Sequence, residues 1–481
     1  MADRAEQTLT AVQSPLSPGE QKDRAVLLVV GSAERPALPA RTRLQIIGDE
    51  LTVGRRAEGL PVLANVAVLD DGLVSGRHAR IARGAGGYDI EDLGSKNGTW
   101  VDNLRTEGKV RLRDGALVFF GNHIAVFRMV SHIELEAIKA ELVTPLGPVA
   151  TASPTLAVAC DRLRRLAASE GELLIVGETG VGKEVYARAV HAASGRKGHF
   201  MAINCAAIPR DLVESELFGY RQGAHSTAHQ AKAGLIEEAE GGTLFLDEIG
   251  EMTPEAQIKI LRFLQDRELT PLGSTRPRRM DVRILAATNR TAGGPGKGPG
   301  GLRDDIVARL GAAPIFLPPL RNRIEDLGAL AAHFLGRGSD RVDGAGLGPA
   351  ESVAGGRGDP PRVPAVFDQP AFRALALHTW PLNVRELEKI VSTAAVLTGG
   401  TKPIAIRDLP EPIARTIAVP AAPGARRAVG PSPTPAQLEE LLRRYEGNVA
   451  DVSRELGKHR AAVWRWIKKF GLGPQKFRRT E

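Results

Sequence analysis

Gly177-Glu178-Thr179-Gly180-Val181-Gly182-Lys183 follows the apolar run Leu173 to Val176 and decides the fold of the middle of this 481-residue chain. A strand that enters a glycine-rich turn and continues as a helix brings backbone N–H groups and the positive helix end to phosphate oxygens, and Lys183 adds its charge. The stretch therefore predicts an α/β domain with a phosphate-binding loop. Glu184 ends the loop, where most loops of this kind carry a Ser or Thr that contacts Mg²⁺.

A second apolar run ends in two carboxylates about one small domain's depth downstream, at Leu244-Phe245-Leu246-Asp247-Glu248. A buried strand that ends in this way places Asp247 to hold Mg²⁺ and Glu248 to polarise an attacking water. Each motif alone also fits an ordinary strand end. Together, at this spacing, they predict a site for ATP and Mg²⁺ with hydrolytic chemistry.

Length and composition are those of a multidomain protein of the soluble class. A chain of 481 residues is long enough for about three domains. Cys160 and Cys205 provide neither a disulfide framework nor a metal cluster. The residues Met1 to Glu6 carry no apolar region of the kind found in signal sequences, and no apolar run approaches the roughly 18 residues that cross a membrane, so we expect a cytoplasmic protein with no membrane partner. The net charge of +8 is a weak indication of a polyanionic partner.

The distribution of apolar runs, turns and Pro/Gly-rich stretches divides the chain into modules. Short apolar segments separated by Asp-Gly, Gly-Gly and Asn-Gly turns predict a β-sandwich, whereas strands alternate with helices from about residue 150. The predicted modules are a disordered tail (1–24), an all-β sandwich (25–130), a linker (131–149), an α/β ATPase subdomain (150–318), its helical lid (319–408), a Pro/Ala-rich linker (409–433) and an all-α C-terminal domain (434–481).

Further motifs extend the ATPase signature over nearly all of residues 150–410. They are Ile203-Asn204-Cys205-Ala206, Glu214-Ser215-Glu216-Leu217-Phe218-Gly219, Thr288-Asn289 and Trp380-Pro381-Leu382-Asn383-Val384-Arg385-Glu386-Leu387. With the phosphate loop, which in this family also carries a Glu after the Lys, they resemble the AAA+ domain of sigma-54-dependent transcriptional activators, also called bacterial enhancer-binding proteins. The resemblance implies a P-loop ATPase that remodels sigma-54 RNA polymerase.

The resemblance also implies roles for residues around the nucleotide. Asn204 would hold the catalytic Glu248 in an inactive pose until ATP is correctly bound. Thr288 and Asn289 would form the sensor of the γ-phosphate, and Arg385 would lie near the nucleotide as part of a second sensor.

Two arginines resemble the fingers that this family donates to a neighbouring subunit, namely Arg303 and Arg309. A donated arginine spreads the transition-state charge of phosphoryl transfer, which implies a homo-oligomeric ring such as a hexamer. From spacing alone, both residues also fit solvated surface arginines.

The loop that contacts sigma-54 in this family normally reads Gly-Ala-Phe-Thr-Gly-Ala. Here the corresponding residues are Gly223-Ala224-His225-Ser226-Thr227-Ala228. His225 and Ser226 replace the Phe and Thr, and Thr227 replaces a Gly that permits tight turns. We therefore expect weakened contact with sigma-54.

Three loops of the sandwich resemble the signature of forkhead-associated (FHA) domains, which bind phosphothreonine peptides. They are Gly54-Arg55, Ser75-Gly76-Arg77-His78 and Ser95-Lys96-Asn97-Gly98-Thr99. The resemblance implies that Arg55 and Ser75 hold the phosphate, because a guanidinium and a hydroxyl suit a dianion, and that Asn97 clamps the peptide backbone. Arg77 and Lys96 would assist, whereas His78 would brace the loop internally.

The last 48 residues resemble the Fis-type helix-turn-helix that ends these activators, with helices expected at Thr434 to Tyr445, Ala450 to Leu456 and Arg460 to Phe470. Val463 and Ile467 would pack inward while the basic face of the third helix enters the major groove of DNA. An amphipathic basic helix that docks on protein is the alternative. The residues expected to contact DNA are Arg460, Trp464, Arg465, Lys468 and Lys469.

The sequence thus favours an ATP-dependent transcription regulator that binds enhancer-like DNA, remodels sigma-54 RNA polymerase and responds to a phosphothreonine protein or peptide. Two alternatives stay open. One is a DNA-bound, phosphopeptide-responsive regulator that keeps the AAA+ fold without productive sigma-54 contact. The other is an AAA+ remodelling enzyme that acts on a different protein.

Overall fold

The computed structural model of the chain divides into two compact units, residues 1–418 and 419–481. The residues that it describes are 24–55, 65–69, 71–209, 212–224, 230–289, 302–310, 314–340, 366–399, 402–418 and 435–445, with the single positions 449, 452, 463, 466, 467, 470 and 472.

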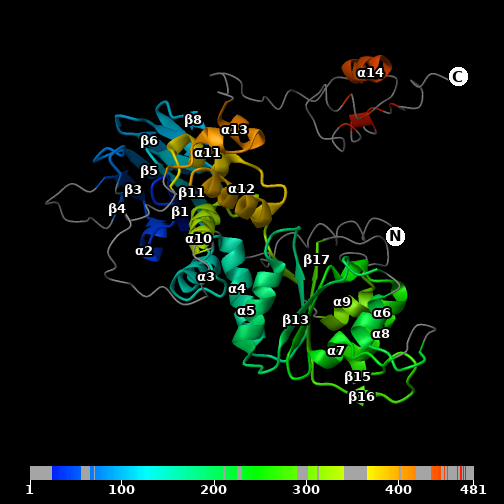
Figure 1. Cartoon of the computed structure of the whole chain (residues 1–481). Coiled ribbons are helices and arrows are strands. Elements are labelled where there is room, and N and C mark those ends of the chain that lie inside the picture. The colour runs from blue at the N-terminus through cyan, green and yellow to red at the C-terminus, as the bar shows by residue number, and fades with distance from the viewer. Residues whose placement is uncertain are drawn as a thin grey trace, which may run out of the picture. The chain divides into compact units, whose positions relative to one another are not determined.

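The first unit begins with a two-sheet sandwich (Figure 1). One sheet has the strand order β2-β1-β11-β10-β7-β8 and the other β4-β3-β5-β6-β9. The short apolar segments predicted as strands are confirmed. The strands are β1 (Arg24–Ser32), β2 (Leu44–Ile47), β3 (Glu50–Gly54), β4 (Val66–Val68), β5 (Ala79–Gly84), β6 (Gly87–Asp92), β7 (Thr99–Val101), β8 (Leu104–Arg105), β9 (Lys109–Leu112), β10 (Leu117–Phe120) and β11 (His123–Val130), with helix α2 (Ala40–Arg43) between β1 and β2.

Strand β1 is buried on both faces. Leu27 and Val29 point into the sandwich core, whereas Val26 and Leu28 pack against α3 (His132–Val143). A continuous apolar run, rather than an alternating one, is typical of such a doubly covered strand. Helix α3 begins with a capping box, in which Ser131 accepts from the Glu134 amide and Glu134 accepts from that of Ser131.

The α/β subdomain has a five-stranded, all-parallel sheet in the order β13-β14-β17-β12-β18. Helices α4 and α5 cover one face and α6 to α9 the other (Figure 1). The elements are α4 (Pro154–Ala167), β12 (Leu173–Val176), α5 (Lys183–Ser194), β13 (Phe200–Asn204), α6 (Val213–Phe218), α7 (Leu235–Glu238), β14 (Thr243–Asp247), η2 (Ile249–Glu251), α8 (Pro254–Asp266), β15 (Glu268–Leu269), β16 (Arg278–Arg279), β17 (Arg283–Thr288), α9 (Asp304–Leu310) and β18 (Ile315–Phe316).

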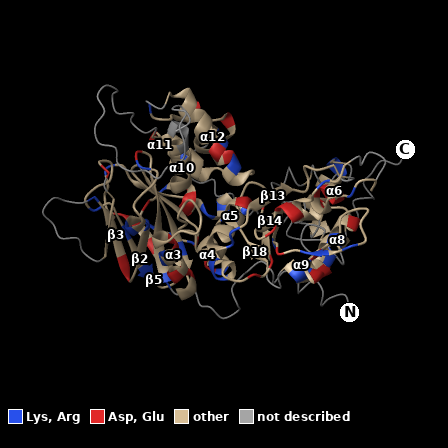
Figure 2. Ribbon diagram, turned by 60° about the horizontal axis from the view of Figure 1, so that its bottom comes forward, with Lys and Arg blue, Asp and Glu red and all other residues tan. Residues whose placement is uncertain are grey.

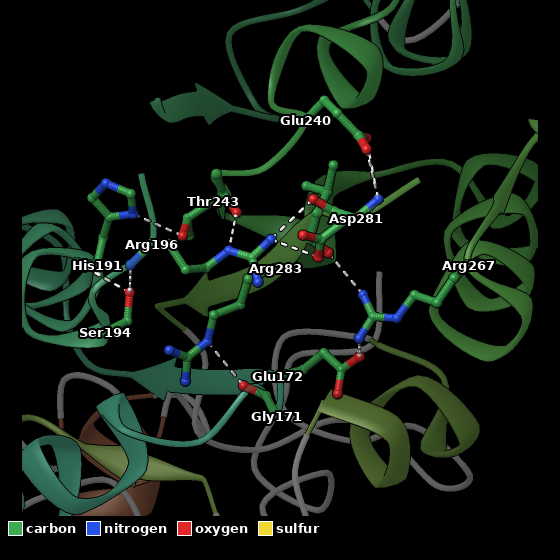
Figure 3. Close-up of polar contacts among 12 residues, drawn as sticks. Gly171, Glu172, His191, Ser194, Arg196, Glu240, Thr243, Arg267, Asp281 and Arg283 are labelled. Carbon is green, nitrogen blue, oxygen red and sulfur yellow. Dashed lines mark hydrogen bonds and ion pairs between the residues drawn. The ribbon is translucent and has the colours of Figure 1, made fainter. Parts of the chain in front are cut away.

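Arginines fasten the amino ends of these strands (Figure 3). Arg283, 2% exposed, donates to the carbonyls of Leu166, Ala167 and Gly171 at the end of α4. Arg196 donates to the Gly242 carbonyl and forms an ion pair with Asp281. These bonds fix the edge of the sheet opposite the strand ends that carry the predicted phosphate loop and carboxylates.

The lid follows the sheet and packs on the sandwich. Its elements are η4 (Leu320–Asn322), η5 (Ile324–Asp326), α10 (Leu327–Asp340), α11 (Gln369–Leu377), α12 (Asn383–Leu397), η6 (Ile406–Asp408) and α13 (Glu411–Ala418). One apolar cluster joins lid residues such as Leu327 and Phe372 to Val30 and Phe119 of the sandwich.

The prediction of a linker over 409–433 is wrong for its first residues, because helix α13 (Glu411–Ala418) forms there. Leu409 and Ile413 are buried in the lid cluster, and Thr416 Oγ1 donates to the Ala374 carbonyl of α11. The Pro-rich composition hid a short amphipathic helix, whose apolar positions are four residues apart.

Two arginines of the sandwich reach adjacent carboxylates in η5. Arg43, 3% exposed, contacts Asp326 at 3.3 Å and donates to the carbonyls of Glu325 and Ala150. Arg128 of β11 forms an ion pair with Glu325. The sandwich and the lid are therefore joined by polar as well as apolar contacts.

The second unit is described only in part. Helix α14 (Pro435–Arg444) lies where the first C-terminal helix was predicted, and Leu438 and Leu442 pack with Val452, Val463 and Ile467. Val463 and Ile467 are buried, at 0% and 3% exposure, as predicted.

Charged residues of both signs alternate along outer helices of the first unit, such as α12 (Figure 2). Among the described residues, no helix is long and apolar enough to cross a membrane.

Candidate nucleotide and phosphopeptide sites

The phosphate loop needs its glycines for two separate reasons. Gly180 and Gly182 have φ values of +80° and +104°, which L side chains rarely adopt. A Cβ on Gly180 would also lie 2.2 Å from the carbonyl oxygen of Leu382. The loop joins β12 to α5, so the first helical N–H groups and Lys183 converge on one place.

Lys183 is buried and engages the second carboxylate motif. Its Nζ lies 3.1 Å from Glu248 Oε1 and donates to the Gly177 carbonyl, also at 3.1 Å. Glu248, with φ +53°, also accepts a bond from the amide of Asn289 through Oε2. The phosphate-loop cation, the carboxylate predicted to polarise water and the first sensor thus form one connected group.

Asp247 lies at the end of β14, beside this group. Burial raises the pKa of Asp247 above its usual range; the Lys183 ammonium opposes this rise and the Glu248 carboxylate adds to it. A bound cation stabilises the charged form of such a carboxyl, because it offsets the cost of burying the carboxylate charge.

These residues line a cavity of about 900 Å³ between the sheet and the lid, large enough for a nucleotide. The predicted residues on its wall are Thr179, Gly180, Val181, Gly182, Lys183, Glu184, Asn204, Asp247, Glu248, Asn289 and Arg385. The donor set fits ATP and Mg²⁺, since it offers loop N–H groups and cations for phosphates and carboxylates for the metal.

Other predicted residues lie outside the cavity wall. Thr288 is buried and its carbonyl accepts from the Gly177 amide. Arg303 and Arg309 are exposed on and beside α9, where Arg303 pairs with Asp305 and Arg309 donates to the Leu264 carbonyl.

Two predicted cavity residues have local partners. Asn204, which was expected to hold Glu248, accepts from the Ala206 amide through Oδ1. The bonds described for the Glu248 carboxylate come from Lys183 and the Asn289 amide. Glu184 pairs with Arg188 one turn along α5, at 2.6 Å.

The lid residues that hold the phosphate loop were not predicted from the sequence. Arg321 forms an ion pair with Glu178, and Arg323 donates to the Val181 carbonyl at 2.6 Å. Asn383, fully buried with φ +56°, donates to Glu178 and to the Thr179 carbonyl. The signals for these residues were the Arg321-Asn322-Arg323 triplet, which follows Pro318-Pro319-Leu320, and the motif that contains Asn383.

Two leucines lie close to the predicted site residues. Leu382, before α12, has φ −106° and a side chain that is 54% exposed. Leu302, next to Arg303, is fully buried in the core of the α/β subdomain.

The predicted phosphopeptide loops meet at one end of the sandwich. A Cβ on Gly54 would lie 2.0 Å from the Gly76 carbonyl oxygen, and the Arg55 amide donates to the Ser75 carbonyl. Ser75 Oγ accepts from the Lys96 amide at 3.2 Å, which leaves its proton for a ligand. The side chains of Arg55, Arg77, Lys96 and Asn97 are exposed.

His78 is buried and braces these loops, as expected. Its Nδ1 accepts from the Ser75 amide at 3.1 Å, and Nε2 lies 3.2 Å from the Gly98 carbonyl. Asn97 Nδ2 donates to the Leu73 carbonyl, so this side chain links a second pair of loops.

Two predicted surfaces fall largely outside the described residues. Of the sigma-contact loop only Gly223 and Ala224 are described, and His225, Ser226, Thr227 and Ala228 are not. The DNA-contact residues Arg460, Trp464, Arg465, Lys468 and Lys469 also lie outside. Both assignments stay predictions.

Fold and site define a regulator built from an FHA sandwich and an AAA+ nucleotide-binding module with a helical lid. Family models agree: residues 149–316 match the sigma-54 interaction domain, 51–121 the FHA domain and 359–423 an AAA+ ATPase lid domain.

Curated relatives extend the match. The chain is 37% identical over 337 residues to the regulatory protein AtoC of Escherichia coli, covering 68% of each protein. It is 34% identical over 381 residues to the C4-dicarboxylate transport transcriptional regulatory protein DctD of Rhizobium meliloti, covering 76% of this chain and 73% of DctD. A crystal structure of NtrX from Brucella abortus in complex with ATP aligns with a TM-score of 0.46 at 28% identity, over 68% of this chain and 70% of NtrX. The chain belongs to the sigma-54-dependent transcriptional activators.

Proposed function

We propose that this activator hydrolyses ATP to remodel sigma-54 RNA polymerase at enhancer-bound DNA, and that phosphothreonine binding to its FHA domain controls this activity. The observation that carries the proposal is the Lys183–Glu248 contact inside the nucleotide-sized cavity. It joins the phosphate-binding cation and the carboxylate that orients water in one group with Asn289.

The same contact suggests how binding prepares hydrolysis. The Lys183 ammonium has three N–H donors and already uses two of them on Glu248 and the Gly177 carbonyl, so two or more phosphate oxygens in the loop would compete with Glu248 for it. A released Glu248 carboxylate could then accept a bond from water, while Asp247 holds Mg²⁺. ATP would supply the phosphoryl group, and Asn204, Asn289 and Arg385 on the cavity wall would report its presence.

The positions of Arg303 and Arg309 support a ring. Both side chains are exposed and absent from the wall of the chain's own cavity, as expected of arginines that act on a neighbouring subunit. We propose a homo-oligomeric ring, such as a hexamer, in which hydrolysis depends on assembly.

The exposed cations around Ser75 support phosphothreonine recognition. Arg55, Arg77 and Lys96 are exposed on the loops that meet at Ser75, whose hydroxyl already accepts from the Lys96 amide. Three cations without an ion pair among the described residues favour a dianion, and a guanidinium can bind two of its oxygens at once.

The experiment that tests the proposal is open-complex formation by the purified full chain with sigma-54 RNA polymerase and ATP on a promoter with an upstream site. Open complexes are expected with the wild type and not with Lys183→Ala. A wild type that hydrolyses ATP without opening the promoter would contradict sigma-54 remodelling.

That second outcome would favour the alternative of a DNA-bound regulator without productive sigma-54 contact. The replacement of Phe by His225 and of Thr by Ser226 supports it, since an imidazole buries less apolar area and costs more to desolvate. Restoring both family residues should then recover open complexes.

A further inference from the structure

The lid packs at the ligand end of the FHA sandwich. The Phe367 amide donates to the Ala33 carbonyl at 2.9 Å, and Gln369 Nε2 donates to the Gly121 carbonyl at 2.6 Å. Strand register places Phe120 opposite Thr99 and Ser32 opposite His123. Helix α11 therefore lies beside the loop that carries Asn97.

A small hollow lies between the loop and the helix, lined by residues that include Asn97, Gly98, Trp100, Phe119, Gln369 and Arg373. Both modules contribute to its wall. A peptide bound across the FHA loops at Asn97 would have the hollow directly beside it.

Arg373 is the charged group in this wall. Its guanidinium carbon lies 4.4 Å from the centre of the Trp100 ring and 4.6 Å from that of Phe119. The Nε and Nη2 atoms are buried without a hydrogen-bond partner among the described residues. Burial lowers the pKa of Arg373, and no carboxylate of the described residues offsets that effect.

Packing on aromatic rings alone does not account for this arrangement. A cation over a ring is attracted to the ring face, but the rings leave the N–H edge of the guanidinium unsatisfied, and each buried donor without a partner is unfavourable. Methionine would fill the same space without that cost. An anion that enters the hollow would remove it.

We propose that Arg373, with Gln369, binds an acidic side chain of the phosphothreonine peptide, so that the ligand is read jointly by the FHA loops and lid helix α11. This inference rests on the proposed phosphothreonine recognition and adds a second determinant to it. The peptide class is one with Asp or Glu at a fixed distance from the phosphothreonine.

The test measures binding of the full chain to phosphothreonine peptides in which Glu is placed at each flanking position in turn and compared with Gln. At one position Glu should bind at least about tenfold more tightly, as for a charge-assisted hydrogen bond. Arg373→Met should abolish the preference for Glu while keeping phosphate-dependent binding, and Arg373→Lys should keep part of it.

Arg407→Met provides the matched control, because it removes an exposed arginine from η6 of the same lid. Its Glu preference should equal that of the wild type. Unchanged ATP binding and a melting temperature no lower than that of the wild type in Arg373→Met would show that the lid has folded.

The outcomes separate this inference from the function on which it rests. Phosphate-dependent binding with no Glu preference, or with a preference that Arg373→Met leaves intact, would overturn the composite site alone. Binding that ignores the phosphate, in wild type and Arg55→Ala alike, would overturn phosphothreonine recognition and the composite site together.

Discussion

Arg128 Nε in strand β11 of the sandwich contacts Glu325 Oε1 in η5, and the Glu325 carboxylate is fully buried. The two residues are nearly two hundred positions apart in the sequence, so this ion pair joins the sandwich to the lid. Arg128 also donates to the Asn322 carbonyl at 3.1 Å. The pair places a sandwich residue directly against the segment whose Arg321 and Arg323 contact the phosphate loop.

Arg128→Met is expected to destabilise the first unit by about 3–5 kcal/mol, because it leaves a buried carboxylate without its partner. Chemical denaturation of the full chain, followed by far-UV circular dichroism, measures this loss. Arg113→Met is the control, since Arg113 pairs with Asp102 at the surface with 79% of its side chain exposed and should change stability by less than about 1 kcal/mol. Equal effects of the two changes would contradict a special role for the buried pair.

Lys183→Ala and Glu248→Gln should separate binding from hydrolysis. Loss of the ammonium should abolish detectable ATP binding, whereas Glu248→Gln should retain ATP and reduce turnover by roughly 10²–10³-fold, the scale of losing a group that orients the nucleophile. A fluorescent ATP analogue measures binding and phosphate release measures turnover. Lys139→Ala, on the exposed face of α3, should match the wild type. Undiminished turnover in Lys183→Ala would refute the site.

Asp247 should make Mg²⁺ binding sensitive to acid. Its pKa is raised, chiefly by burial, so the carboxyl becomes protonated at a higher pH than an ordinary Asp and then cannot hold the metal. The Mg²⁺ concentration needed for half-maximal hydrolysis should therefore rise as pH falls through this raised pKa. Nucleotide binding in EDTA should change little over the same range.

The same shift has a stability consequence of known sign. Between the unfolded pKa of about 3.9 and the raised folded pKa, the folded state binds more protons, so the contribution of Asp247 to stability falls as pH rises through this window. Asp247→Asn should thus raise the melting temperature of the nucleotide-free protein at pH 7 while abolishing Mg²⁺-dependent hydrolysis. A lower melting temperature would show that the carboxylate stabilises the fold.

Arg283→Met should destabilise the α/β subdomain by about 2–4 kcal/mol, since three carbonyls at the end of α4 lose their donors in a buried setting. Arg279→Met, whose exposed side chain precedes the same strand, is the control. Thermal unfolding compares the two variants. A change below about 1 kcal/mol in Arg283→Met would mean that water or neighbouring groups replace those bonds.

The parts of the fold that depend on local sequence patterns could be predicted. The run Leu173 to Val176 forms β12 with the predicted bounds, and the positive φ of Gly180 and Gly182 follows from the turn between a buried strand and a helix. The carboxylates after β14 lie at the same sheet edge because parallel strands end there together.

Contacts between distant segments could not be predicted in the same way. The motif that contains Asn383 indicates a place near the nucleotide but not the bond from its amide to the Thr179 carbonyl, and Arg373 in an amphipathic helix carries no sign of Trp100. Such contacts depend on how the modules pack against one another. The spacing of residues along the chain does not determine that packing. The helix α13 was missed for a different reason, since prolines before and after it suggested a linker.

The seven residues from Leu320 to Asp326 contact the phosphate loop through Arg321 and Arg323, and the sandwich through Glu325 and Asp326. This has a consequence for domain exchange. A different sensory domain fused in place of the sandwich would leave Glu325 and Asp326 without their arginine partners unless it offered basic side chains where Arg43 and Arg128 now lie, although Asp326 would keep its bonds from Thr151 and Ala152. The interface thus restricts which sensors this ATPase can accept, and a chimaera designed without those two charges should fold poorly even if each half is stable alone.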